Sequence, residues 1–482
     1  MKYFGTDGIR GIAFEKLDSE LAYKVGQAIA HVFKPEIVVI GMDTRESSPM
    51  LAYSIANGLL ALGVNVDFAG VVSTPMIAHY SKIHNIIGVM ITASHNPFMD
   101  NGIKVFNKGY KTIEEDELKL EEFIDFGKLS ITSFGKLYIT DHVKEAYLKI
   151  YDALDLKPSN LKIGFDSAHG ANYQISREIF DLINPSSIQI SNKPTGRNIN
   201  LNCGSTHLDR ILDLVKDQKL DIAFSFDGDG DRIILIDHLA RVYDGDLIIY
   251  MIAKYLKKKN LLTHNKVVLT KMSNPGILKA LDDEGIGYVL TDVGDKYVFH
   301  ELYTNGYTIG GESSGHIILT HLLHTGDGLL VAIYLLKILE EMNVSLESLI
   351  ENVTMYPLKL TNLKGMDKQV LKKEKVIAKI EDVRRRLGDH SLLLVRPSGT
   401  ESLIRITVSH KDQDVVNKLT QELIDTIQEE GSKLWKNMHW FLLPEKAHVC
   451  ALNYPKLHSL FWRNPWLNTS LKTLKNRWLM RL

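Results

Sequence analysis

The chain has 482 residues, of which 45% are hydrophobic and 24% are charged, and its formal net charge is -1. These values are ordinary for globular proteins and exclude a wholly disordered or fibrous chain. A net charge near zero gives no global field that would attract nucleic acid or an anionic membrane. Because the length exceeds what one hydrophobic core usually serves, we expect about three to five domains.

The two cysteines, Cys203 and Cys450, are far apart and lack C-x-x-C spacing. The sequence therefore predicts neither a disulfide framework nor a cysteine-based zinc site. The first residues turn polar at once, without the apolar core of a secretory signal. The longest apolar stretch, residues 329–336, is far shorter than the roughly 20 residues that span a bilayer. We expect a cytoplasmic protein without a transmembrane segment.

Strands and helices alternate along most of the chain. Short apolar runs that end in turns with Gly or Asp predict buried strands at residues 37–40, 161–163 and 267–269. Apolar residues at three- and four-residue spacing predict helices at residues 51–62, 210–216, 247–256 and 328–342. This alternation is typical of α/β domains with substantially parallel sheets. The similarity of segments 38–43 and 161–166 also indicates a repeated unit.

We therefore predict three tandem α/β domains with mixed sheets, followed by a smaller C-terminal α+β domain. Their limits are residues 1–150, 151–245, 246–355 and 356–432. The fourth domain is expected to contain a helix over 368–387, strands around 392–395 and 404–408, and a helix over 415–429.

The remaining residues, 433–482, form an atypical basic tail that holds all five tryptophans. We interpret it as an accidental or frame-shifted extension, with a docking segment or a contact to nucleic acid or membrane as alternatives. No contact with nucleic acid is expected for residues 1–432.

A metal site is indicated by three aspartates, Asp227, Asp229 and Asp231, that alternate with glycines and precede Arg232. A tight loop can direct these carboxylates at one cation, and hard oxygen ligands suit Mg²⁺. An EF-hand loop would need Gly at the sixth position and Glu at the twelfth, where this chain has Arg232 and His238. A solvated acidic turn stays an alternative.

A candidate phosphate acceptor, Ser94, lies in the segment Thr-Ala-Ser-His-Asn-Pro directly after the apolar run 86–91. A turn or helix cap is the more common role for a serine in this setting. Lys104 follows ten residues later and can pair with phosphate or relay a proton.

A phosphate-binding loop is predicted in the segment Arg-Pro-Ser-Gly-Thr-Glu, which begins at Arg396. A guanidinium, two hydroxyls and backbone N–H groups suit a phosphate dianion, and Arg405 can join them. A plain turn placed by the proline and the glycine is the alternative.

A polar loop at residues 311–315 matches the G-x-S-x-G pattern of serine hydrolases. That pattern requires a following helix, whereas residues 316–319 are predicted to form a strand. We interpret Glu312, Ser314 and His316 instead as a loop for sugar hydroxyls. Residues 5–11 lack the preceding strand of a dinucleotide fingerprint, and there is no Walker A sequence.

In their order and spacing, these motifs resemble the α-D-phosphohexomutase superfamily over residues 1 to about 430. The resemblance also rests on residues 4–11, 202–207, 293–298 and 310–316. It implies a heart-shaped molecule of four domains, each of which gives one loop to a common cleft. The sequence departs from the usual pattern at Leu208, Lys296, Ser313 and Ser402.

The resemblance also implies a role for each site residue. The catalytic residues would be Ser94, as the phosphoserine, with Lys104, Arg10 and His316. One Mg²⁺ per subunit would be held by the Ser94 phosphate with Asp227, Asp229 and Asp231. The substrate-binding residues would be Arg232, Glu312, Ser314, Arg396, Ser398, Gly399, Thr400 and Arg405.

The implied reaction is an isomerisation that moves phosphate between the 6- and 1-positions of a sugar through a 1,6-bisphosphate intermediate. Glucosamine phosphate, as used in amino-sugar and peptidoglycan precursor synthesis, is the expected substrate, and glucose and mannose phosphates are the alternatives. A sugar 1,6-bisphosphate is the expected activator, and a kinase or autophosphorylation can charge Ser94. A homodimer is left open. From another class, a catalytically silent phosphosugar-binding protein would not need Ser94, Lys104 and the aspartates together.

Overall fold

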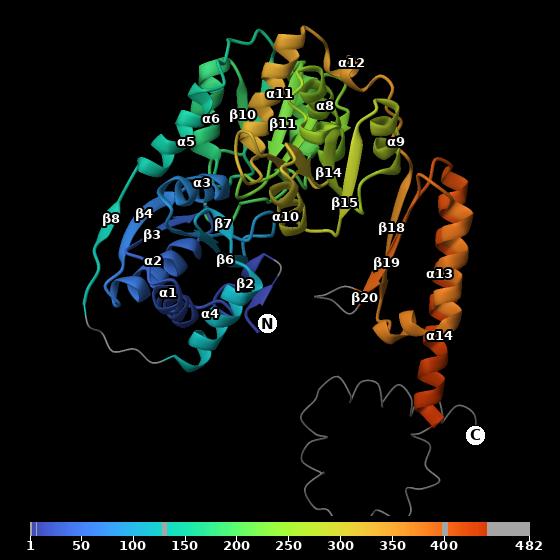
Figure 1. Ribbon diagram of the computed structural model, residues 1–482, viewed down its shortest axis with the longest axis horizontal. Helices are drawn as coiled ribbons and strands as arrows, with labels where there is room; N and C mark the ends of the chain where they lie inside the picture. Colours follow the sequence, from blue (N-terminus) through green and yellow to red (C-terminus); the bar gives the residue numbers. More distant parts are fainter. Residues whose placement is uncertain (1, 6, 128–132, 398–402, 441–482) are drawn as a thin grey trace, which may run out of the picture. The chain divides into compact units, whose positions relative to one another are not determined.

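The computed structural model describes residues 2–5, 7–127, 133–397 and 403–440 (Figure 1). The chain divides into two compact units. Residues 1–359, 387–394 and 407–416 make up the first unit, and residues 360–386, 395–406 and 417–482 make up the second. Three of the four sheets lie entirely in the first unit.

The first sheet has eight strands in the order β1-β2-β6-β5-β3-β4-β8, with β7 paired to β6. Its strands are β1 (Phe4–Gly5), β2 (Gly8–Ile12), β3 (Ile37–Met42), β4 (Asn65–Val71), β5 (Ile87–Ile91), β6 (Asp100–Asn107), β7 (Tyr110–Lys111) and β8 (Leu137–Ile139). Its helices are α1 (Ser19–Phe33), α2 (Ser48–Leu60), α3 (Thr74–His84), α4 (Glu114–Phe126) and α5 (His142–Asp152). Every residue of β5 is buried, as its uninterrupted apolar sequence predicts.

The second sheet has five strands in the order β10-β9-β11-β12-β13, and the third has four in the order β15-β14-β16-β17. The second comprises β9 (Ile163–Asp166), β10 (Ile188–Ile190), β11 (Ile222–Phe226), β12 (Ile233–Asp237) and β13 (Val242–Tyr243), with α6 (Tyr173–Ile183) and α7 (Asp209–Gln218). The third comprises β14 (Lys266–Thr270), β15 (Gly287–Thr291), β16 (Ile309–Gly311) and β17 (Ile317–Leu319). With it are α8 (Gly245–Lys258), α9 (Pro275–Asp283), α10 (Asp295–Asn305), α11 (Gly328–Met342) and α12 (Leu346–Ile350). One continuous hydrophobic core includes residues of all three sheets, such as Val39, Phe224 and Leu269.

Helix α11 has the bounds that its apolar spacing predicts, residues 328–342, which confirms that prediction. Asp327 caps its start, because the carboxylate accepts a hydrogen bond from the backbone N–H of Leu330. Asn343 ends it in the left-handed conformation that asparagine tolerates better than most residues.

All three sheets are mixed, which confirms the mixed sheets predicted for the three α/β domains. Each contains parallel strand pairs, but β5 pairs antiparallel with β6, β11 with β12, and β16 with β17. The physical reason is the short connection: a few residues can close a hairpin, whereas a parallel return needs a long crossover. The three loops with candidate site residues are these hairpin connections. The repeat in the sequence thus corresponds to a strand–loop–strand arrangement that recurs in each of the three sheets.

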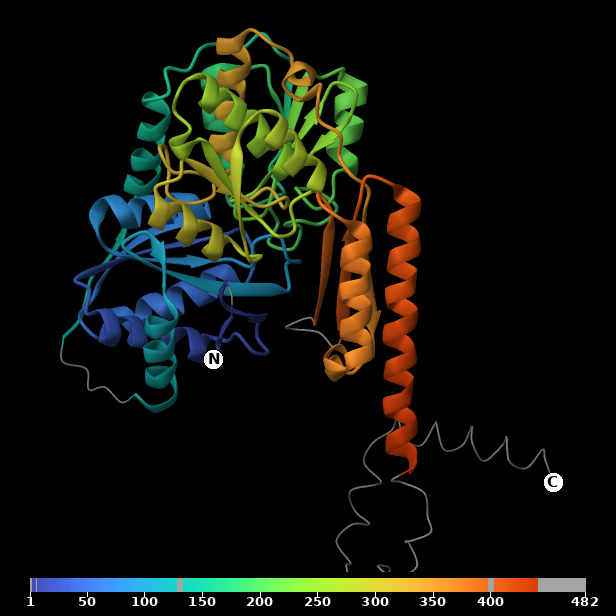
Figure 2. The ribbon, with the colours of Figure 1, turned by 45° about the vertical axis from the view of Figure 1, so that its right-hand side comes forward.

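The fourth sheet has the order β18-β20-β19 and is built from β18 (Leu358–Lys364), β19 (Leu392–Pro397) and β20 (Leu403–Ser409). Helices α13 (Glu374–Leu387) and α14 (Gln413–Trp440) lie side by side (Figure 2) and are joined by ion pairs from Lys379 and Arg386 to Glu422. The helix expected over 368–387 is divided into a 3₁₀ turn, η2 (Lys368–Lys372), and α13. The helix expected to end at 429 continues to Trp440, into the segment we had assigned to the tail.

No helix in the described part of the chain is long and apolar enough to cross a membrane.

Candidate active site

Ser94 lies in the hairpin loop between β5 and β6, and its side chain is buried. Its hydroxyl donates a 2.6 Å hydrogen bond to Asp227 Oδ2, on the corresponding loop of the second sheet. Its backbone has a φ of 52°, in the left-handed region that only glycine and a few polar residues visit readily. The candidate phosphate acceptor is therefore held in a strained conformation beside the aspartate loop.

The aspartate loop joins β11 to β12, and its three carboxylates each offer an oxygen within 4.8 Å of the others. All three side chains are buried. Burial and the nearby negative charges of Asp231 and Asp229 raise the pKa of Asp227 well above its usual value. Asp229 Oδ1 and Asp231 Oδ1 are buried carboxylate oxygens without a hydrogen-bond partner among the described residues. A divalent cation would satisfy both oxygens, so these residues fit the predicted Mg²⁺ site.

Lys104 on β6 lies against this loop and is almost fully buried. Its Nζ is 2.9 Å from Asp229 Oδ2, 3.6 Å from Asp231 Oδ2 and 3.4 Å from Asp7 Oδ2. Burial alone would lower the pKa of Lys104, but the three carboxylates outweigh it and raise the pKa above its usual value. Burial raises the pKa of Asp229, whereas the positive charge of Lys104 lowers it. Overall, the pKa of Asp229 lies below its usual value. Lys104 is therefore an ammonium, and Asp229 is a carboxylate, at neutral pH.

An ion network continues from Lys104 toward the third sheet. Asp7 forms ion pairs with Arg10 and with Lys111, whose Nζ lies 2.6 Å from Asp7 Oδ1. Lys111 also pairs with Asp295 at the start of α10. His316 Nε2 is 3.7 Å from the same Asp295 carboxylate. The network thus joins residues from the first and third sheets around the site.

The predicted sugar loop joins β16 to β17. Its strand continuation excludes the serine-hydrolase interpretation, because no helix follows Ser313. Glu312 Oε1 accepts a 2.9 Å hydrogen bond from the backbone N–H of Gly294, and Ser314 is exposed. His316 is buried, and its Nε2 is 4.0 Å from Asp231 Oδ2. Arg232, whose Nε is 3.9 Å from Asp231 Oδ1, forms a bridge with His316 in the backbone.

The predicted phosphate loop belongs to the fourth sheet. Arg396 lies on β19 and Arg405 on the adjacent strand β20, and both side chains are partly exposed. Ser398, Gly399 and Thr400 lie outside the described residues.

Several residues of the site escaped the sequence interpretation. Asp7 lies in a motif that supports the resemblance, but no role was predicted for it. The same is true of Asp295. Lys111 was not singled out, and neither were Arg45 and Asn200, whose side chains donate hydrogen bonds to the Ser94 carbonyl oxygen. The pair of Lys111 and Asp295 was missed because its side chains meet only after segments 184 residues apart pack together, so no spacing in the sequence reveals it.

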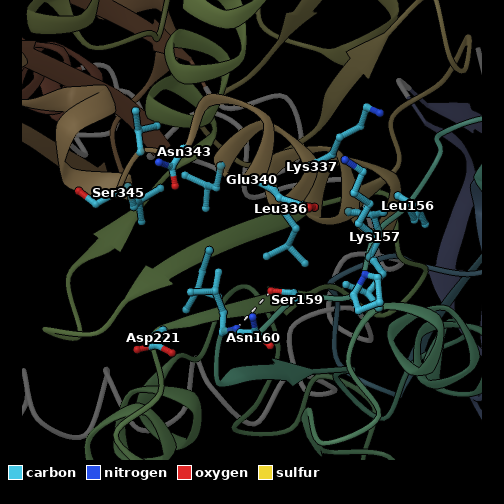
Figure 3. Close-up of a pocket in the computed structure, with 18 of the residues that line it drawn as sticks. Leu156, Lys157, Ser159, Asn160, Asp221, Leu336, Lys337, Glu340, Asn343 and Ser345 are labelled. Atoms are coloured by element: carbon cyan, nitrogen blue, oxygen red, sulfur yellow. Dashed lines mark hydrogen bonds between the residues drawn. The ribbon is translucent and has the colours of Figure 1, made fainter.

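A cavity of about 780 Å³ lies elsewhere, and none of the predicted site residues line it. Leu336 and Asn343 at the C-terminal end of α11 line one side, opposite Asn160 and Asp221 (Figure 3). Since it has neither the carboxylate cluster nor Ser94, the size of this cavity is no argument for placing the chemistry there.

Comparison with known proteins shows the family of the chain. The sequence patterns of phosphoglucomutase/phosphomannomutase alpha/beta/alpha domains I, II and III match residues 1–129, 138–240 and 244–356, and that of the C-terminal domain matches residues 358–426. Phosphoglucosamine mutases of Lachnoclostridium phytofermentans and Bacillus cytotoxicus are each 39% identical to this chain, over 89% of it and 99% of their own length.

Solved structures share the fold. A phosphoglucomutase/phosphomannomutase family protein of Burkholderia thailandensis superposes with a TM-score of 0.75 at 20% identity, over 89% of this chain and 97% of that one. An Aspergillus fumigatus N-acetylphosphoglucosamine mutase, solved with GlcNAc-6P and magnesium, gives 0.64 at 15% identity, over 89% and 96%. This chain belongs to the phosphoglucomutase/phosphomannomutase family, and the predicted α-D-phosphohexomutase superfamily and four-domain α/β fold class are confirmed.

Proposed function

We propose that this chain is a phosphoglucosamine mutase, an isomerase that interconverts glucosamine 6-phosphate and glucosamine 1-phosphate. The observation that carries the proposal is the 2.6 Å contact between the Ser94 hydroxyl and Asp227, within a buried cluster of three aspartates and Lys104. The curated relatives with that activity, 39% identical over 89% of the chain, support the choice of sugar.

Ser94 is the phosphate carrier in this proposal. Its phosphoryl group passes to a hydroxyl of the sugar phosphate: the bond between phosphorus and Ser94 Oγ breaks, and a bond to the sugar oxygen forms. The resulting 1,6-bisphosphate turns around in the site and returns its other phosphate to Ser94. A free sugar 1,6-bisphosphate charges the serine at the outset, as an activator.

Asp227, Asp229 and Asp231 hold one Mg²⁺ ion. When bound, it neutralises charge that develops on the transferring phosphoryl oxygens, which is the main requirement of such a reaction. The Oδ1 atoms of Asp229 and Asp231, which have no hydrogen-bond partner within the described part of the chain, support this assignment.

Lys104 supplies a proton rather than removing one, since its carboxylate neighbours keep it protonated. An ammonium close to the aspartate loop can donate to Ser94 Oγ as the phosphoryl group leaves, and it stabilises negative charge there. His316 is the candidate base for the sugar hydroxyl, and Arg10 and Arg232 attract the phosphoryl oxygens.

The remaining predicted residues recognise the substrate. Glu312 and Ser314 contact sugar hydroxyls, and Arg396 and Arg405 attract the phosphate that does not react, together with Ser398, Gly399 and Thr400. Because one phosphate loop can serve both orientations of the bisphosphate, the same site carries out both half-reactions. We further propose the four domain limits given above, a cytoplasmic location and, as an open alternative to a monomer, a homodimer.

The test is ³¹P NMR of the purified protein with Mg²⁺ and a trace of sugar bisphosphate, offered glucosamine, glucose and mannose 6-phosphates in parallel. We expect glucosamine 6-phosphate to be converted fastest, and Ser94→Ala to abolish conversion. Ser176→Ala is the matched control, since Ser176 is equally buried and bonds to Ser167 and Gln189, away from the aspartates.

Conversion by Ser94→Ala at the wild-type rate would refute the role of Ser94. Faster conversion of glucose or mannose 6-phosphate would correct the substrate. If protein whose mass shows phosphorylated Ser94 converts no sugar, the chain is a phosphosugar-binding protein.

A further inference from the structure

Arg45 is among the largest side chains that are fully enclosed in the described part of the chain, with an exposed fraction of 1%. It follows β3 in the loop that leads to α2. Its Nε donates a 2.8 Å hydrogen bond to Asp43 Oδ2, two residues earlier, so its charge is balanced inside its own loop. Asp43 is fixed in turn, since its carboxylate also accepts from the backbone N–H of Arg45 and from the hydroxyl of Ser48.

The other two guanidinium nitrogens of Arg45 bind the backbone of the Ser94 loop. One donates to the carbonyl oxygens of Ser94 and Asn96, each at 2.9 Å, and the other donates to the carbonyl oxygen of Pro97. One planar guanidinium group thus holds three backbone carbonyls of this loop.

Asn200, in the segment between β10 and α7, binds two of the same carbonyl oxygens. Its Nδ2 donates to Ser94 O at 2.9 Å and to Asn96 O at 3.1 Å. The Ser94 carbonyl therefore has two side-chain donors, from loops about 150 residues apart in sequence.

These bonds explain how Ser94 keeps a left-handed backbone, which is unfavourable for residues other than glycine. Such strain persists only where the surroundings determine the backbone in several ways. Fixing the Ser94 carbonyl fixes the rotation of its peptide plane. Since the Cβ of Ser94 is rigidly attached to that backbone, the direction of the Cα–Cβ bond is fixed as well. The remaining rotation about this bond is set by the hydrogen bond from Oγ to Asp227.

We propose that Arg45 is a positioning residue for phosphoryl transfer. It does not touch the reacting atoms; it holds three carbonyls so that Ser94 Oγ stays at the aspartate loop while phosphate is gained and lost. This inference rests on the proposed role of Ser94 as the phosphate carrier.

The decisive variant is Arg45→Lys. A lysine keeps the positive charge beside Asp43, but it is a point charge on a flexible stem and cannot bind the carboxylate and three carbonyls together. We expect kcat for glucosamine 6-phosphate to fall about tenfold to a hundredfold, the scale of a misplaced reacting group. KM should stay within about threefold of the wild-type value, because Arg45 binds the backbone of the Ser94 loop and not the substrate. Phosphorylation of Ser94 by sugar bisphosphate, followed by intact mass, should slow by a similar factor.

The matched control is Arg177→Lys. Arg177 also combines a carbonyl, Ser187 O at 2.8 Å, with a carboxylate, Asp181 at 2.6 Å, but away from the site. A kcat for Arg45→Lys within threefold of wild type, or a fall that Arg177→Lys reproduces, overturns the proposal. A loss of kcat/KM that comes only from a higher KM, with kcat unchanged, also overturns it.

Asn200→Ala keeps the proposal testable if Arg45→Lys does not fold. It removes the second donor to Ser94 O and Asn96 O and should lower kcat about threefold to tenfold without changing KM; an unchanged kcat overturns the proposal. Ser94→Ala, assayed alongside, separates the two ideas. If it stays active, the proposed role of Ser94 fails, whereas an inactive Ser94→Ala with a fully active Arg45→Lys overturns the role of Arg45 alone.

Discussion

Replacing Lys104 by methionine should damage both stability and catalysis, for reasons that can be measured separately. Methionine preserves most of the length and volume of the buried side chain but removes its charge. Asp229, Asp7 and Asp231, which have oxygens 2.9, 3.4 and 3.6 Å from Lys104 Nζ, then lose a shared cation. Breaking a buried ion pair by removing one partner typically costs about 3–5 kcal/mol, because the remaining charge stays buried.

The loss of stability should depend on Mg²⁺. A divalent cation compensates two of the same carboxylates, so we expect Mg²⁺ to raise the melting temperature of Lys104→Met more than that of the wild type. The catalytic loss is independent of this effect: removing a general acid lowers kcat by about 10²–10⁴. Melting temperatures with and without Mg²⁺, and kcat at saturating Mg²⁺ and substrate, measure the two contributions.

Lys279→Met is the control, because Lys279 forms an exposed ion pair with Asp283, and exposed pairs contribute little to stability. If Lys104→Met retains kcat within about threefold of the wild type, Lys104 is not the proton donor. If its metal-free melting temperature matches that of Lys279→Met, the reasoning about the buried carboxylates is wrong.

Two further predictions concern buried carboxylates outside the reacting centre. Burial raises the pKa of Asp246 from 3.8 to about 7. The folded chain therefore favours protonated Asp246, and this contribution to stability is fully present below pH 3.8 and is lost as the pH rises through 7. Asp246→Asn should therefore have a higher melting temperature than the wild type at about pH 8 and lose this advantage near pH 4. A difference in melting temperature that is the same at both pH values would contradict the prediction. Tyr147→Phe removes a 2.6 Å hydrogen bond to Asp327 and should cost about 1.5–3 kcal/mol in urea unfolding, whereas a cost below about 0.5 kcal/mol would show that the bond contributes little.

The contacts within each loop were predictable from sequence, but the contacts between loops were not. Asp227, Asp229 and Asp231 share one short turn, so their convergence follows from local geometry. Ser94 and Lys104 lie on one hairpin, and their proximity follows once β5 and β6 pair. By contrast, the ion pairs of Lys111 and the carbonyl bonds of Arg45 depend on the docking of distant segments, which hydrophobic periodicity does not encode.

Strand direction is mixed in each of the three sheets, as the predicted fold class states. Alternating strands and helices favour parallel pairing, and that holds for pairs such as β3 with β4 and β14 with β15. It fails where two strands follow each other without a helix, as β5 and β6 do. The sequence did contain this signal, because only about ten residues separate the apolar run before Ser94 from the one that contains Lys104.

The charge of the cluster links the proposed phosphoserine to the proposed metal. Among the described residues, it combines five aspartates with two lysines and two arginines: Asp7, Asp227, Asp229, Asp231, Asp295, Lys104, Lys111, Arg10 and Arg232. The pKa of Asp227 is raised first by its burial and then by the negative charges of Asp231 and Asp229. A phosphate on Ser94 adds about -1.5 to -2, which a divalent cation offsets almost completely. The phosphate alone or the cation alone would leave the buried site with an unbalanced charge. We therefore expect the two to be bound together, at the contact between Ser94 and Asp227.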